Sequence, residues 1–150
     1  MPPMGRKSVA DMGWELTDGT HDTLRDYEGK VLVLDFYATW CAPCRESVPH
    51  LIELQRRLEN DGLKVIGLNV GGPEDLDKIS DFARELGIQY TLALPDRDLA
   101  SFLLSDNGSI PQTFVFDRKG VLVKRFIGYE QTTAKEISQI VETTLQSPTY

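Results

Sequence analysis

The stretch Trp40-Cys41-Ala42-Pro43-Cys44 contains the only two cysteines of this 150-residue chain, and it closely follows the apolar run Val31-Leu32-Val33-Leu34-Asp35-Phe36-Tyr37. The run predicts a central strand, and apolar residues at helical spacing after Cys44 predict a helix. A Cys-x-x-Cys pair in the first turn of a helix places its first sulfur near unpaired backbone N–H groups and the helix dipole, which favour a thiolate. The pattern therefore predicts a redox pair in which Cys41 attacks a partner and Cys44 resolves the mixed disulfide.

Other uses of two cysteines fit the sequence less well. A zinc site needs further ligands at matched spacing, and His21 and His50 lie in no Cys/His cluster. Covalent haem attachment needs a histidine after the second cysteine, where Arg45 stands. A peroxidatic cysteine is disfavoured because Leu34 and Ala38 occupy the places of the proline and threonine in the peroxiredoxin pattern. A structural disulfide that closes so small a loop would constrain the unfolded chain very little.

Length and charge narrow the class of protein. A chain of 150 residues is most simply one domain, here residues 1–150, with enough length to bury a core without disulfides. The net charge of −7 argues against nucleic acid and anionic membranes as partners. No apolar run approaches the ~20 residues of a spanning helix, and Met1-Pro2-Pro3-Met4-Gly5-Arg6-Lys7 lacks the apolar segment of a signal peptide.

Hydrophobic periodicity predicts an α/β order of elements. Short strands around the turn at 17–20 precede the strand at 31–37, and a helix containing Pro49 follows the cysteines. The remaining elements are expected as a strand at 64–70, a helix opened by Pro73 with a stripe of Leu76, Ile79, Ala83 and Leu86, a short strand at 91–94, a short helix at 98–104, a hairpin of 112–117 and 121–127, and a terminal helix with a Thr133-x-x-Glu136 capping box. This order predicts an α/β sandwich with a mixed sheet.

Two segments resemble the thioredoxin superfamily: the stretch from Asp35 to Cys44, and Ser109-Ile110-Pro111-Gln112-Thr113-Phe114. The stretch 37–41, the N-terminal hairpin and a strand-helix unit inserted around 70–94 are similar to the TlpA/ResA-type thiol-disulfide oxidoreductases. The resemblance covers about residues 14–145. It implies a thioredoxin-like three-layer sandwich, a mixed β-sheet with helices on both faces, in which Pro111 is a cis-proline that faces the cysteines and Trp40 shields the site.

The chain departs from the TlpA/ResA pattern at three positions. Asp35 stands where those proteins commonly have asparagine and thioredoxins have an acid. Gly67 occupies the place at which many thioredoxins put a lysine near that acid, so Asp35 is expected to lack this partner. Ser47 replaces the glutamate that many relatives acting on apocytochrome c carry, with Glu46 one residue earlier. A role in cytochrome maturation is accordingly in doubt.

The residues around the cysteines have expected roles of their own. Burial should raise the pKa of Asp35 and prepare it to exchange a proton with Cys44 through water. The backbone of Ile110, before Pro111, is expected to pair with an extended substrate peptide. The substrate-binding residues are thus predicted to be Trp40, Ala42, Pro43, Ile110 and Pro111.

The sequence also bears on the direction of the reaction. Ala42-Pro43 contains no histidine, which favours the reducing end of the family. Arg45 either approaches the sulfur or is a solvated surface residue.

The leading hypothesis is an enzyme that reduces protein disulfides and needs no bound cofactor or metal. An upstream thiol donor, thioredoxin-like or a membrane reductase, would recharge it. A monomer is expected, at an extracytoplasmic location. A non-catalytic peptide-binding module and a thiol peroxidase are the alternatives.

Overall fold

The computed structural model describes residues 8–147, so the segment Met1–Lys7 and its missing signal-peptide pattern lie outside the described residues. Within this range seven strands form one mixed sheet in the order β2-β1-β5-β4-β3-β6-β7. The strands are β1 (Gly13–Leu16), β2 (His21–Thr23), β3 (Val31–Tyr37), β4 (Leu63–Asn69), β5 (Thr91–Pro95), β6 (Gln112–Phe116) and β7 (Leu122–Ile127). The predicted N-terminal hairpin is present, and β1 joins it to the sheet by pairing antiparallel with β5.

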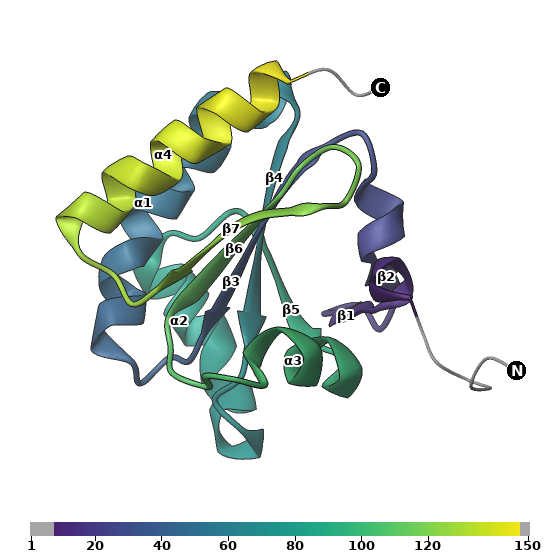
Figure 1. Ribbon diagram of the computed structural model, residues 1–150. Coiled ribbons are helices and arrows are strands. Elements are labelled where there is room, and N and C mark those ends of the chain that lie inside the picture. The colour runs from purple at the N-terminus through teal and green to yellow at the C-terminus, as the bar shows by residue number, and fades with distance from the viewer. Residues whose placement is uncertain (1–7, 148–150) are drawn as a thin grey trace, which may run out of the picture.

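Helices cover both faces of this sheet, as predicted (Figure 1). The α-helices are α1 (Ala42–Leu58), α2 (Ile79–Leu86), α3 (Arg97–Leu104) and α4 (Gln131–Gln146). Single 3-10 helices are η1 (Val9–Asp11), η2 (Leu24–Tyr27), η3 (Glu59–Asp61) and η4 (Pro73–Lys78). Along residues 8–147 no helix has both the length and the apolar character that crossing a membrane requires.

The alternation of side chains along β3 divides the core between the two faces. Leu32, Leu34 and Phe36 pack on the face covered by α3 and the N-terminal segment. Val31 and Val33 pack on the opposite face, against α1 and α4. Every residue of β3 is buried, because β4 pairs with it in parallel on one side and β6 antiparallel on the other. The strand that precedes the cysteines is therefore the centre of the sheet, as predicted.

One arginine joins three segments at the edge of the molecule. Arg118, in the turn between β6 and β7, donates hydrogen bonds to the backbone carbonyls of Gly29, Asp61 and Leu145 at 2.9, 3.1 and 2.8 Å. These carbonyls belong to the segment before β3, to η3 and to the end of α4. A single guanidinium thus donates to backbone acceptors of three separate segments.

Two local predictions about helices are wrong. Helix α4 begins at Gln131, and its capping box joins Glu130 to Thr133 instead of Thr133 to Glu136. The helix opened by Pro73 starts as the 3-10 helix η4 before continuing as α2. Because a 3-10 helix has about 3.0 residues per turn, the α-helical stripe does not hold there. Leu76 is 46% exposed, and the buried residue of α2 is Phe82, which the predicted stripe omitted.

Candidate active site

The two cysteines lie after β3, at the start of α1. Cys41 is the N-cap of α1 and forms a disulfide with Cys44. The backbone N–H of Cys44 points at Cys41 Sγ, 3.3 Å away, so the helix N-terminus faces this sulfur. Cys41 is 6% exposed and Cys44 is fully buried. Of the two cysteines only Cys41 therefore keeps any exposed surface.

Asp35 is buried in the middle of β3, with only 1% of its surface exposed. It lies opposite Gly67 on β4 and Thr113 on β6, so Gly67 holds the cross-strand position that the sequence assigned to it. Thr113 Oγ1 donates to Asp35 Oδ1 at 3.5 Å. Burial raises the pKa of Asp35 to about 8, and the hydrogen bond from Thr113 only partly opposes this rise.

The position of Asp35 on the strand fixes the face that it shares. Alternation along β3 places it on the same face as Val33 and Tyr37. Val33 packs with α1, and Tyr37 belongs to a buried cluster that contains Cys41 and Cys44. The carboxyl group therefore belongs to the interior layer that continues to the cysteines.

The loop between α3 and β6 approaches the cysteines from the other side. The Ile110–Pro111 peptide bond is cis, as the resemblance implied. The carbonyl oxygen of Ile110 lies 3.9 Å from Cys41 Sγ. Pro111 is buried, and its own carbonyl accepts a hydrogen bond from the N–H of Gly128 at 2.8 Å.

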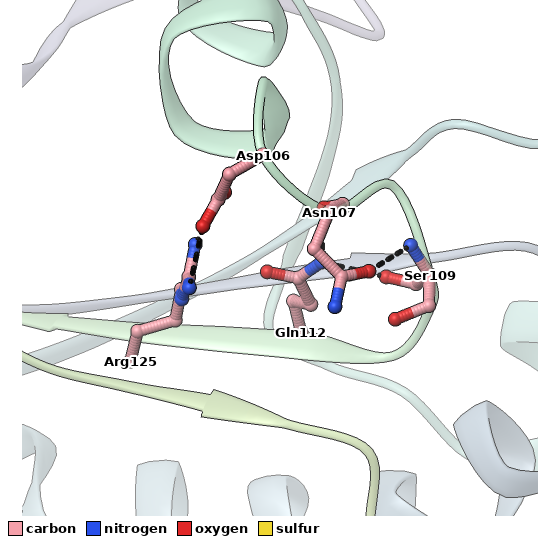
Figure 2. Close-up of polar contacts among 5 residues, drawn as sticks. All are labelled: Asp106, Asn107, Ser109, Gln112 and Arg125. Atoms are coloured by element: carbon pink, nitrogen blue, oxygen red, sulfur yellow. Dashed lines mark hydrogen bonds and ion pairs between the residues drawn. The ribbon is translucent and has the colours of Figure 1, made fainter.

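Side chains hold this loop in place, as Figure 2 shows. The amide of Gln112 donates to the carbonyls of Asn107 and Ser109 at 2.6 and 2.8 Å, and Asn107 Oδ1 accepts the N–H of Ser109 at 2.9 Å. Arg125 on β7 makes two bonds to the Asp106 carboxylate, at 2.8 and 3.0 Å. The residues before Ile110 are thus tied to the two strands that follow it.

The predicted substrate-binding residues surround the exposed edge of Cys41. Trp40 is 67% exposed, Ala42 and Pro43 are exposed, and Ile110 is half-buried. None of these side chains carries a charge. Exposed uncharged residues therefore stand on both sides of Cys41 in the sequence, and their contacts with substrate remain a prediction.

Two polar residues near the cysteines point away from the sulfurs. Arg45 donates to the carbonyl of Thr39 at 3.2 Å and pairs with Glu85 at 2.7 Å, so the option in which it approaches Cys41 is wrong. Ser47 is buried and donates to the carbonyl of Cys44 at 2.8 Å, back onto its own helix. Position 47, where many relatives acting on apocytochrome c carry a glutamate, therefore has a hydroxyl in place of a carboxylate.

Some residues of the site escaped prediction from sequence. Thr113 lies inside the quoted proline motif but was given no role there, and strand pairing brings it to Asp35. Asp75 lies in an acidic stretch typical of solvated surface, yet it is buried against Thr39 beside the cysteine loop. Among the described residues no cluster of three His, Cys, Asp or Glu side chains is arranged to hold a metal ion.

Known proteins are similar to this chain in sequence and in fold. The chain matches the AhpC/TSA family over residues 6–125. It belongs to this family. It is 30% identical over 125 residues to the thiol-disulfide oxidoreductase ResA of Geobacillus thermodenitrificans, covering 83% of this chain and 69% of that protein. It is 33% identical over 124 residues to the thiol:disulfide interchange protein HelX of Rhodobacter capsulatus, covering 81% and 66%.

Solved structures confirm the thioredoxin-like fold. A thiol:disulfide interchange protein of the thioredoxin family from Chlorobium tepidum superposes with a TM-score of 0.75 at 25% identity, covering 95% of this chain and 99% of that one. The chain spans 60 to 69% of the length of the ResA relatives from the two Geobacillus species and Bacillus subtilis. The chain thus combines a cysteine pair at the N-terminus of α1 with 30% identity to a protein named as a thiol-disulfide oxidoreductase.

Proposed function

We propose that this chain reduces disulfides in protein substrates through the Cys41–Cys44 dithiol. The observation that carries the proposal is the difference between the two sulfurs. Cys41, at the N-terminus of α1 between exposed uncharged neighbours, keeps 6% of its surface exposed, whereas Cys44 is fully buried behind it. A substrate disulfide can reach the first sulfur but not the second.

The exchange then follows in two steps. The Cys41 thiolate attacks one sulfur of a substrate disulfide, forms a mixed disulfide and releases the other substrate sulfur as a thiolate, which takes up a proton. Cys44 loses its proton and attacks Cys41 Sγ, which forms the Cys41–Cys44 disulfide and releases the second substrate thiol. The substrate gains two electrons and the dithiol loses two, so a thiol donor must reduce the pair again.

In this proposal Asp35 accepts the proton of Cys44 through water. Burial raises its pKa to about 8, so the carboxylate binds a proton more strongly than an ordinary aspartate does and is a better proton acceptor for a thiol. The support is its burial in the layer that leads to the cysteines and the absence of a charged partner on β4.

The surface beside Cys41 is assigned to the substrate peptide. The carbonyl of Ile110 lies 3.9 Å from Cys41 Sγ, within reach of a chain bonded to that sulfur. An extended segment can pair with the backbone before Pro111 while its side chains contact Trp40, Ala42 and Pro43. This arrangement fits unfolded or flexible protein segments that contain a disulfide.

The wider setting belongs to the same proposal. The donor is expected to be a thioredoxin-like protein or a membrane reductase, and the location extracytoplasmic, on the strength of the likeness to ResA and HelX. The net charge of −7 supports protein partners over nucleic acid. A monomer is expected.

Reduction of insulin by dithiothreitol tests the proposal. The wild-type protein should accelerate it and Cys41→Ser should not. A protein that binds peptide without accelerating the reaction is the non-catalytic module. Peroxide consumption that continues in Cys44→Ser indicates the thiol peroxidase instead.

A further inference from the structure

Thr39 lies between the end of β3 and Cys41, and its polar groups are held by the segment inserted after β4. Its backbone N–H donates to Asp75 Oδ2 at 2.9 Å, and its hydroxyl donates to Asp75 Oδ1 at 2.5 Å. The Asn69 amide donates to the same Asp75 Oδ2 at 2.9 Å. Thr39, Asn69 and Asp75 are all buried, and Asp75 is only 1% exposed.

The loop between β4 and η4 packs closely against the Asp75 carboxylate. A Cβ on Gly71 would meet Asp75 Oδ2 directly, so glycine allows the loop between β4 and η4 to fold over the carboxylate. The N–H of Gly71 donates to Asn69 Oδ1 at 2.9 Å and closes the loop from the other side. Burial raises the pKa of Asp75, but the hydrogen bonds from Asn69 and Thr39 outweigh it and leave the pKa below its ordinary value.

Arg45 on α1, which contacts the inserted segment, also holds Thr39. Arg45 donates to the carbonyl of Thr39 at 3.2 Å, pairs with Glu85 on α2 and lies 5.3 Å from the centre of the Phe82 ring. The Arg45–Glu85 pair is partly exposed, with 33% and 64% of the two side chains accessible, so it contributes little. The buried, charge-assisted bonds to Asp75 therefore dominate the hold on Thr39.

We propose that Asp75 is a positioning residue for thiol–disulfide exchange, holding Thr39 so that the loop presents Trp40 and Cys41 at a fixed place on the N-terminus of α1. This inference rests on the proposed function. Both carboxylate oxygens accept hydrogen bonds from Thr39 or Asn69, so Asp75 acts on the cysteine loop through Thr39. Small displacements of reacting atoms cost large factors in rate, which is why a hold one residue from Trp40 matters.

Paired substitutions test it. Thr39→Val keeps the shape of the side chain and removes the hydroxyl, while Thr39→Ser keeps the hydroxyl. Asp75→Ala removes the acceptors, while Asp75→Asn keeps one oxygen for the two N–H donors and turns its amide toward the Thr39 hydroxyl, which can accept. Asp77→Ala, on an exposed residue of the same η4, is the matched control. Thermal melts establish the temperature at which each protein is folded.

Two readouts separate positioning from stability: kcat and KM for insulin reduction, and the pH profile of iodoacetamide alkylation of Cys41 in a Cys44→Ser background. In Asp75→Ala and Thr39→Val, kcat should fall about tenfold, equivalent to about 1.4 kcal/mol, and alkylation should move to higher pH. Asp75→Asn and Thr39→Ser should remain within about twofold of the wild-type protein, a difference of only about 0.4 kcal/mol.

The outcomes distinguish a failure of the positioning role from a failure of the proposed function. If Asp75→Ala and Thr39→Val fold less stably but keep the wild-type kcat and alkylation profile, Asp75 is only structural and the inference is overturned. If Asp75→Ala does not fold, the Thr39→Val and Thr39→Ser pair decides by the same criteria. A wild-type protein that does not accelerate insulin reduction would overturn the proposed function, and this inference with it.

Discussion

Replacing Asp35 by asparagine should make the stability of the fold less dependent on pH. The pKa of Asp35 is raised by burial from 3.8 to about 8, so the folded protein binds a proton that the unfolded chain releases over most of this range. The stabilisation that comes from protonated Asp35 is complete below the unfolded pKa and is lost as the pH rises through the folded pKa. Asparagine has no such proton to lose.

The size of the effect follows from the two pKa values. Each pH unit between them costs the wild-type protein about 1.4 kcal/mol of unfolding free energy, so from pH 4 to pH 8 it should lose about 5 kcal/mol relative to Asp35→Asn. The substitution also changes the hydrogen bond with Thr113, and this changes the unfolding free energy by the same amount at both pH values. It therefore cancels in the comparison.

Denaturant melts of the oxidised proteins at pH 4 and pH 8 measure this difference, because the cysteines of the disulfide do not titrate. Asp77→Asn, which changes an exposed carboxylate, should follow the wild-type protein at both values. A wild-type protein that loses less than about 1 kcal/mol relative to Asp35→Asn would show that Asp35 is ionised at little cost in the fold. In that case its role as the proton acceptor for Cys44 would be withdrawn.

Three further predictions concern resolution, the fold and the substrate loop. Cys44→Ser should accumulate a mixed disulfide through Cys41, seen by mass spectrometry, and equal trapping through Cys44 in Cys41→Ser would contradict the roles assigned. Arg118→Ala should lower the unfolding free energy by about 2 kcal/mol, since three carbonyls lose a charged donor, with exposed Arg84→Ala as control. Gln112→Met should raise KM for insulin without changing iodoacetamide alkylation of Cys41; a change in alkylation alone would refute its assignment to the substrate loop.

The elements that local pattern specifies were predicted well. The apolar run of β3 and the helical spacing after Cys44 depend on neighbouring residues only, so sequence placed both cysteines correctly at the start of α1. The burial of Asp35 followed from its place inside that run. The cis peptide before Pro111 came from the resemblance, since an X-Pro bond can take either form.

What sequence missed depends on contacts between distant segments. Asp75 lies 36 residues from Thr39, and only the fold shows that an acidic stretch turns one carboxylate inward. Arg45 was open to two interpretations because the position of Glu85 on α2 was unknown. The start of α4 was ambiguous because residues 130 and 133 also form a capping pair. For Asp75 and Arg45 a tertiary contact decided between the local options, whereas at α4 one of two local capping pairs formed.

The surroundings of the cysteines also predict the direction of the redox reaction. The residues between them, Ala42 and Pro43, are uncharged, and Arg45 directs its guanidinium to Thr39 and Glu85 instead of to the sulfur. The stabilisation of a Cys41 thiolate then comes mainly from the helix N-terminus, through contacts such as the N–H of Cys44.

Fewer stabilising groups on the thiolate leave the dithiol form less favoured and the protein a better reductant. We expect a reduction potential nearer the about −270 mV of thioredoxin than the about −120 mV of DsbA. Equilibration with glutathione of known redox ratio measures it. A value more oxidising than about −180 mV would mean that some group not identified here stabilises the thiolate, and the assignment as a reductase would fail.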